Sequence, residues 1–88
     1  MELKITSRTI KDEFGRARRF HYSLIIDQVE TGRFACENYG VGIREECGDY
    51  AAIPNITTSA MRIDELMTLL VEHKVGPTTL ADVVADWL

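Results

Sequence analysis

Four side chains of this sequence are of the types that bind metals or act as nucleophiles: His21, Cys36, Cys47 and His73. Structural zinc sites usually take two ligands from one turn, through short Cys-x-x-Cys or His-x-x-x-His spacings, and neither spacing is present. A nucleophilic pair such as Cys47 with His21 needs hydrogen-bond contact and a third group that orients the base. Gly-x-Ser-x-Gly, Walker-type and Rossmann-type glycine patterns are absent. We therefore expect no metal site, no cofactor and no catalytic residues.

Two acidic pairs have spacings that could bind Mg²⁺ or serve acid–base catalysis. Asp82 and Asp86 lie four residues apart, and Glu45 and Glu46 are adjacent in a predicted turn. The aspartates fall on the helical side opposite Trp87 and its apolar neighbours, which is where solvated charges usually lie. We interpret both pairs as surface charge.

The one dense positive stretch contains Arg16, Arg18 and Arg19. In a nucleic-acid site, these arginines would bind phosphates while a neighbouring aromatic side chain stacks on a base. The net charge of −4, with its negative excess in the C-terminal half, disfavours a nucleic-acid partner. Alternatively, the arginines pair with Asp12 and Glu13 at the mouth of a hairpin, or they dock onto an acidic surface such as that of a second copy.

The elements that position these residues begin with strands, predicted over residues 3–10, 18–27, 34–45 and 50–53. In the second strand, apolar residues alternate so that Phe20, Tyr22, Leu24 and Ile26 share one face, as in an antiparallel strand with one wet face. Glycines 40 and 42 suggest a bulge or the close approach of a neighbour. Pro54 suggests that the last strand ends there or lies at a sheet edge.

The opposite face of this sheet would carry Ile25, Phe34 and Cys36 on neighbouring strands. A cluster of exposed apolar side chains marks a contact surface, so Ile25 and Phe34 are candidate binding residues. Coverage by the loop around Phe14, or a different strand register, is the alternative.

Two short helices follow, joined at Val75-Gly76-Pro77. Their apolar residues recur at spacings of three and four, which predicts two stripes that must be buried. Thr58 or Ser59 can cap the first helix, Gly76 can close it, and Pro77 can open the second. The expected anchors of the helices on the sheet are Tyr22, Leu66, Leu70, Val84 and Trp87.

The 88 residues are sufficient for one domain with a single modest core. We predict an α+β domain over residues 1–88: a four-stranded, mostly antiparallel β-meander (1–56) with two C-terminal helices (58–88) packed on one face. No secretory signal and no apolar run of about 20 residues is present, which indicates a cytoplasmic protein without a membrane span. Both cysteines are then expected to stay reduced.

Several segments resemble a family of small bacterial proteins of unknown function, found in clostridia and their relatives: Asn38–Ile43, Ile56–Thr58, Leu69–Pro77 and Leu80–Leu88. The chain departs from the family pattern at Gly76, where serine is usual, and at Trp87, where phenylalanine is usual. The resemblance covers roughly the second half of the chain. It implies a bacterial cytoplasmic origin and brings no function.

The sequence therefore favours a small, non-catalytic, cytoplasmic interaction or accessory protein that binds another protein or a second copy of itself. A nucleic-acid accessory protein that uses Arg16, Arg18 and Arg19 is the alternative. An enzyme with a Cys–His site is the second alternative.

Overall fold

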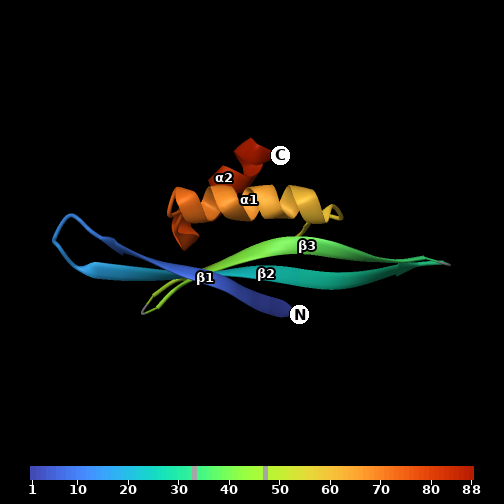
Figure 1. Cartoon of the computed structure of the whole chain (residues 1–88), viewed down its shortest axis with the longest axis horizontal. Helices are drawn as coiled ribbons and strands as arrows, with labels where there is room; N and C mark the ends of the chain where they lie inside the picture. Colours follow the sequence, from blue (N-terminus) through green and yellow to red (C-terminus); the bar gives the residue numbers. More distant parts are fainter. Residues whose placement is uncertain (33, 47) are drawn as a thin grey trace.

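The computed structural model describes residues 1–32, 34–46 and 48–88, and only the backbone of Thr31 and Phe34. Four strands, β1 (Glu2–Lys11), β2 (Ala17–Thr31), β3 (Phe34–Glu45) and β4 (Tyr50–Thr57), form one antiparallel sheet in the order β1-β2-β3-β4. The helix α1 (Ala60–Glu72), the 3₁₀ helix η1 (Pro77–Thr79) and the helix α2 (Leu80–Trp87) follow. The helices cover one face of the sheet (Figure 1). The predicted α+β fold is confirmed.

The strand register explains which side chains face the helices. Tyr22 lies opposite Ile43 and Leu24 lies opposite Val41, so the apolar positions of β2 and β3 share one face. On that face, Tyr22 and Ile43 are completely buried, and Leu66 and Leu70 of α1 are completely buried above them. The period-two pattern of β2 and the helical pattern of α1 therefore meet in one core.

One buried hydrogen bond joins the sheet to the segment between the helices. The hydroxyl of Tyr22 donates to the carbonyl oxygen of Val75 at 2.9 Å. Burial raises the pKa of Tyr22 to about 12, because the phenolate would lose its hydration there. The bond satisfies a carbonyl that has left the helical ladder, and it fixes the end of α1 above the centre of β2.

The helical pair is packed mainly by its aliphatic residues. Leu80 is completely buried and Val84 nearly so. Trp87, expected as the main anchor of α2, is only partly buried, at the margin of the core. The guanidinium of Arg62 lies 4.4 Å from the centre of its ring. The indole therefore covers the core with one face and presents the other to a cation.

The helix boundaries follow the predicted caps in part. The hydroxyl of Ser59 accepts a hydrogen bond from the backbone N–H of Arg62 at 3.2 Å and caps α1. The left-handed residue after α1 is Lys74, with φ of 52°, rather than Gly76, which is extended. A Cβ at Gly76 would lie 3.2 Å from the ring of Phe20. Gly76 therefore lets this ring approach, while Pro77 opens η1 as predicted.

The edge strand β4 continues past Pro54 to Thr57, further than the predicted end at Ile53. Asn55 takes a left-handed φ of 58°, and the β3–β4 register shifts between Tyr39 and Val41. A Cβ at Gly40 would lie 2.3 Å from the carbonyl oxygen of Ile53. Gly40 thus marks the close approach that its position in the sequence suggested, and Pro54 lies in an edge strand.

The molecule is elongated, with principal extents of 54 × 23 × 17 Å. Beyond Ile26 and Tyr39, β2 and β3 pair only with each other and extend past the helices as a two-stranded ribbon (Figure 1). Within the described ranges, neither helix has the length and hydropathy needed to cross a membrane.

Candidate functional site

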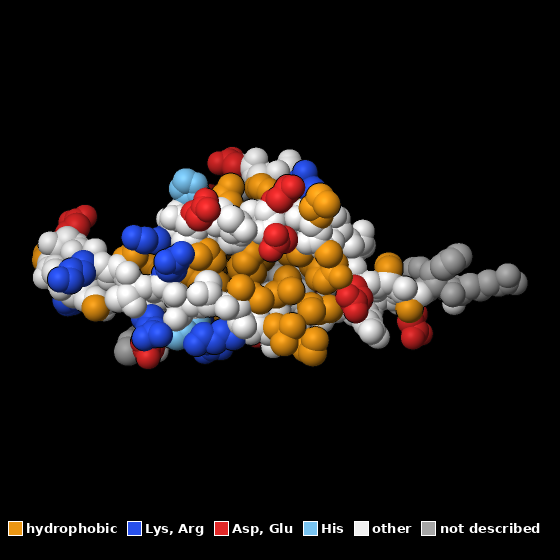
Figure 2. Space-filling model, viewed as in Figure 1, with side chains coloured by type: hydrophobic (Ala, Val, Ile, Leu, Met, Phe, Trp, Pro, Cys, Tyr) orange, Lys and Arg blue, Asp and Glu red, His pale blue; other side chains and the backbone are white. Residues whose placement is uncertain are grey.

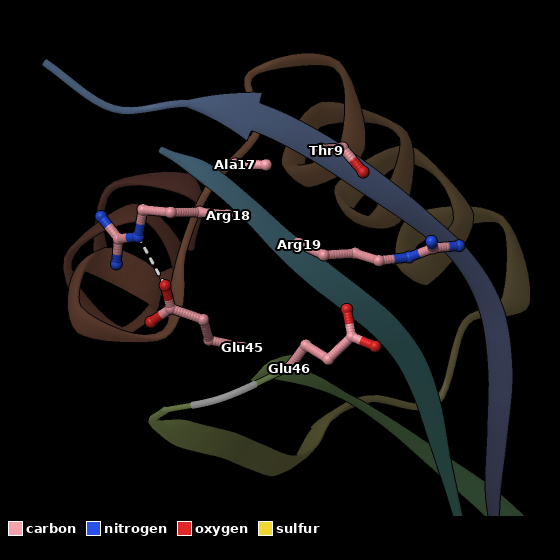
Figure 3. Close-up of a pocket in the computed structure, with 6 residues that line it drawn as sticks. All are labelled: Thr9, Ala17, Arg18, Arg19, Glu45 and Glu46. Carbon is pink, nitrogen blue, oxygen red and sulfur yellow. Dashed lines mark hydrogen bonds and ion pairs between the residues drawn. The ribbon is translucent and has the colours of Figure 1, made fainter. Parts of the chain in front are cut away.

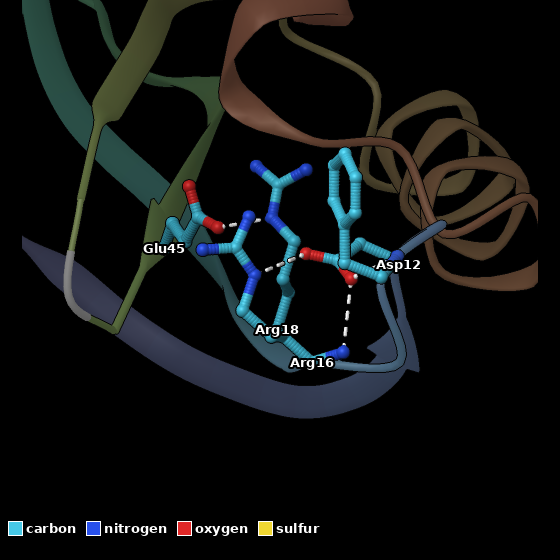
Figure 4. Close-up of polar contacts among 5 residues, drawn as sticks. Asp12, Arg16, Arg18 and Glu45 are labelled. Carbon is cyan, nitrogen blue, oxygen red and sulfur yellow. Dashed lines mark hydrogen bonds and ion pairs between the residues drawn. The ribbon is translucent and has the colours of Figure 1, made fainter.

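The predicted arginine stretch lies at the mouth of the β1–β2 hairpin, where the turn is built on Asp12. The carboxylate of Asp12 accepts hydrogen bonds from the backbone N–H of Phe14 and of Arg16, both at 2.9 Å. The Nε of Arg16 lies 3.2 Å from the same carboxylate. These bonds, led by the one from the Arg16 backbone, lower the pKa of Asp12. Arg16 is therefore held in the turn by the residue that forms the turn (Figure 4).

Arg18 forms a second ion pair beside the first. Its Nε donates to Oε1 of Glu45, and its guanidinium also lies over the ring of Phe20. The hydrogen bond to Arg18 lowers the pKa of the Glu45 carboxyl and raises that of the guanidinium. Figure 4 shows the two ion pairs side by side, Arg16 with Asp12 and Arg18 with Glu45. Two of the three arginines predicted to bind phosphates are thus paired with carboxylates instead.

Arg19 points away from Arg18, because successive side chains of a strand alternate between faces (Figure 3). Its guanidinium donates to the hydroxyl of Ser7 at 3.1 Å. A shallow cavity of about 330 Å³ between the two arginines is also lined by Thr9, Ala17, Glu45 and Glu46. The three arginines therefore do not form one surface, and the cavity between them carries both signs of charge.

The histidines and cysteines of the described residues lie apart. His21 and Cys36 lie on β2 and β3, and Cys36 pairs with Val29, eight residues along β2 from His21. At about 3.3 Å per residue this separates them by roughly 26 Å. His73 ends α1 on the helical layer, and Cys47 lies outside the described residues. Among residues 1–32, 34–46 and 48–88, no three His, Cys, Asp or Glu side chains come together as a metal site.

On the outer face of the sheet, polar side chains lie beside Ile25, one of the predicted binding residues. Ile25 is partly buried there, Cys36 is exposed, and the side chain of Phe34 lies outside the described part of the chain. Glu2 and Tyr50 reach across Gly42 from opposite edges, and the hydroxyl of Tyr50 lies 3.4 Å from the Glu2 carboxylate. The guanidinium of Arg44 lies over the Tyr50 ring at 4.7 Å. Polar groups therefore cross the part of this face that surrounds Ile25.

Exposed apolar side chains occur instead along β1, below α1. Leu3 is 43% exposed and Ile5 is 49% exposed. The β1–β2 register shifts between Lys4 and Thr6, so Ile5 is the extra residue of a bulge and points, like Thr6, toward α1. Figure 2 shows hydrophobic side chains gathered on this side of the molecule, beneath the helical layer.

A groove runs between β1 and α1 at this position, and we call it the β1–α1 groove. It consists of two hollows, of about 300 and 270 Å³, that share Ile5, Asp64 and Met67. The first hollow is apolar and adds Leu24, Tyr39, Ala60 and Ile63. The second is more polar and adds Thr6, Arg8, Thr68, Val71 and Glu72. The groove thus combines an apolar floor with carboxylates on its helical wall.

Asp82 and Asp86 lie exposed on α2 and do not line the β1–α1 groove. The sequence prediction did not single out Leu3, Ile5 or Met67 as binding residues. The sequence feature that pointed to this groove was the presence of two apolar residues, Leu3 and Ile5, at the start of the first strand. The bulge that turns Ile5 toward α1 has no signature in the sequence.

A family model of proteins of unknown function, DUF6514, matches residues 1–88. The chain belongs to the DUF6514 family. The match covers both the sheet and the helical pair, so the β1–α1 groove lies within a single DUF6514 domain. Comparisons with curated proteins and with solved structures gave no match.

Proposed function

We propose that this DUF6514 protein is a non-catalytic binding protein that takes up an extended segment of a protein partner in the β1–α1 groove. The observation that carries the proposal is the position of the exposed apolar residues. Leu3 and Ile5 lie on an edge strand, next to an apolar hollow under α1. An edge strand offers unpaired backbone groups, and a neighbouring hollow offers specificity for side chains, which together are the elements of strand addition.

The charge of the groove indicates what the partner segment should contain. Among the residues of the second hollow, the carboxylates of Asp64 and Glu72 on α1 outnumber the one guanidinium of Arg8 on β1. Ile5 of β1 and Met67 of α1 supply apolar side chains. A segment with apolar side chains at alternate positions and a Lys or Arg directed toward α1 would match both. We further propose that the protein acts in the cytoplasm of a bacterial cell, as the family resemblance suggests.

A displayed library of random 12-residue peptides, selected on the immobilised full chain, tests this proposal. We expect enriched peptides with alternating apolar residues, and we expect Ile5→Asp to abolish their binding because it places a charge in the hollow. Met61→Asp is the matched control, since Met61 is 74% exposed on α1 and does not line the groove. If no peptide binds in an Ile5-dependent manner, and the chain does not self-associate either, the proposal is refuted.

Nucleic-acid binding through Arg16, Arg18 and Arg19 is the weaker candidate. Two of the three guanidinium groups are paired with carboxylates, and the third lies on another face. Fluorescence anisotropy with mixed oligonucleotides at low ionic strength separates the two candidates. Binding that weakens steeply as salt rises would favour the nucleic-acid role.

A further inference from the structure

The two edges of the sheet differ in how open they are to another strand. The β4 edge contains Pro54, which cannot donate a backbone hydrogen bond, and the left-handed Asn55. The β1 edge has ten residues without proline or glycine. The side chains of Leu3 and Ile5 are about half exposed beside it. Of the two edges, β1 is therefore the one suited to pairing.

We propose that the segment bound at the β1–α1 groove is β1 of a second copy of this chain. The inference rests on the proposed function and names its partner. The two strands would pair antiparallel about a twofold axis at Ser7, so that the two sheets become one continuous sheet with both helical layers on the same side.

The faces of β1 fix this register. Leu3, Thr6, Arg8 and Ile10 point toward the helices, because they pair with helix-facing residues of β2. Pairing centred on Ser7 places Thr6 opposite Arg8 of the second copy and, beyond the Ile5 bulge, Leu3 opposite Ile10. Every pair then joins side chains of the same face. A shift by one residue would direct Leu3 to the wrong face.

The charges select the same register. Glu2 would lie opposite Lys11 of the second copy, its carboxylate turning from the Tyr50 hydroxyl toward the ammonium group, and the twofold axis repeats this pair at the other end. A shift by two residues in one direction would place Lys4 opposite Lys11, where like charges repel, and in the other direction Glu2 would face Thr9. The Ser7 register is thus the one that pairs opposite charges.

The residues that line the groove also complement the second copy in the Ser7 register. Opposite Thr6, Arg8 of the second copy would lie on the helix-facing side, where Asp64 and Glu72 line the second hollow. Its guanidinium would therefore meet carboxylates of α1, and Leu3 with Ile10 would cover the apolar part of the joined sheet. These are the chemical features that the proposed partner segment requires.

Cysteine cross-linking of the full chain tests the register, in a background with Cys36 and Cys47 replaced by serine. In the Ser7→Cys variant, the two thiols would face each other across the axis within disulfide range, so we expect a disulfide-linked dimer under mild oxidation. Thr9→Cys is the matched control, since its two copies would be separated by roughly 13 Å along the strands. A dimer linked as readily through Thr9→Cys would overturn the register.

Sedimentation measures the association itself. We expect the 10.0 kDa chain to approach twice this mass with rising concentration. Glu2→Lys or Lys11→Glu should weaken the dimer about tenfold or more, and the double variant should restore it. Lys74→Glu, an exposed charge reversal at a residue that does not line the β1–α1 groove, should have no effect, and circular dichroism verifies that each variant folds.

A chain that stays monomeric at millimolar concentration but binds displayed peptides through Ile5 refutes self-pairing and leaves the proposed function standing. A chain that does neither refutes both. A dimer that is insensitive to the charge reversals and to Ile5→Asp would place the contact on another surface and would also refute the inference.

Discussion

Replacing Tyr22 by phenylalanine removes the hydroxyl that holds the end of α1 over the sheet. Tyr22 is completely buried, and its hydroxyl donates to the carbonyl of Val75 at 2.9 Å. Because the carbonyl would remain buried without this partner, we expect a loss of about 1–2 kcal/mol in the free energy of unfolding. For a domain of this size, such a loss lowers the melting temperature by about 5–15 °C. Urea unfolding followed by circular dichroism measures the change.

The same residue predicts an alkaline transition. Burial raises the pKa of Tyr22 from 10.0 to about 12 in the folded state. The group therefore contributes stability that is fully present below pH 10 and is lost as the pH rises from 10 to 12. Two pKa units correspond to about 3 kcal/mol, an order-of-magnitude value. The Tyr22→Phe variant should lack this part of the alkaline fall in stability.

Tyr50→Phe provides the matched control, since it deletes the same atom from a residue that is 46% exposed. Its free energy of unfolding should change by less than about 0.5 kcal/mol. Two results together would show that the hydrogen bond does not fix the helical layer. Tyr22→Phe would be as stable as this control, and its stability would fall between pH 10 and 12 by as much as that of the unsubstituted chain. The reasoning would then be refuted.

Three further changes test the local structure. Gly40→Ala should cost more than about 2 kcal/mol in denaturant unfolding, because its Cβ would lie 2.3 Å from the carbonyl oxygen of Ile53; an unchanged midpoint would contradict this contact. Lys74→Gly should stabilise by about 0.5–1 kcal/mol, because glycine takes a φ of 52° without strain, and Lys74→Ala should not. By NMR titration, the pKa of the Glu45 carboxyl should lie below 4.5, and Arg18→Gln should bring it back toward that value; equal midpoints would exclude the ion pair in solution.

The fold could be predicted because its main signals are local. The alternation around Tyr22 sets one face of β2, and Pro77 sets the start of η1. The extension of β4 beyond Pro54 depends on contacts that the sequence does not display. The left-handed backbone of Asn55 and the close approach to Gly40 belong to the pairing of β3 with β4. Likewise, the left-handed angle after α1 is taken by Lys74, and Gly76 lies against the ring of Phe20 instead.

The candidate site could be predicted much less well, since it depends on where α1 lies relative to β1. Adjacency in the chain suggested that Arg18 and Arg19 act together, but strand alternation directs them to different faces. Ile5 occupies the groove only because a bulge interrupts the period of two. No pattern in a single sequence predicts this bulge or the lateral position of α1.

Because the strands differ in length, the strands that pair with β2 change along its course. From Phe20 to Ile26 it has neighbours on both sides and helices above, whereas from Asp27 onward it pairs with β3 alone. A two-strand ladder is marginal in water, so amide protons of Gln28 and Val29 should exchange with solvent far sooner than those of Tyr22 and Leu24. A single strand would then record a gradient of protection along its length, from an anchored half to a half that opens independently.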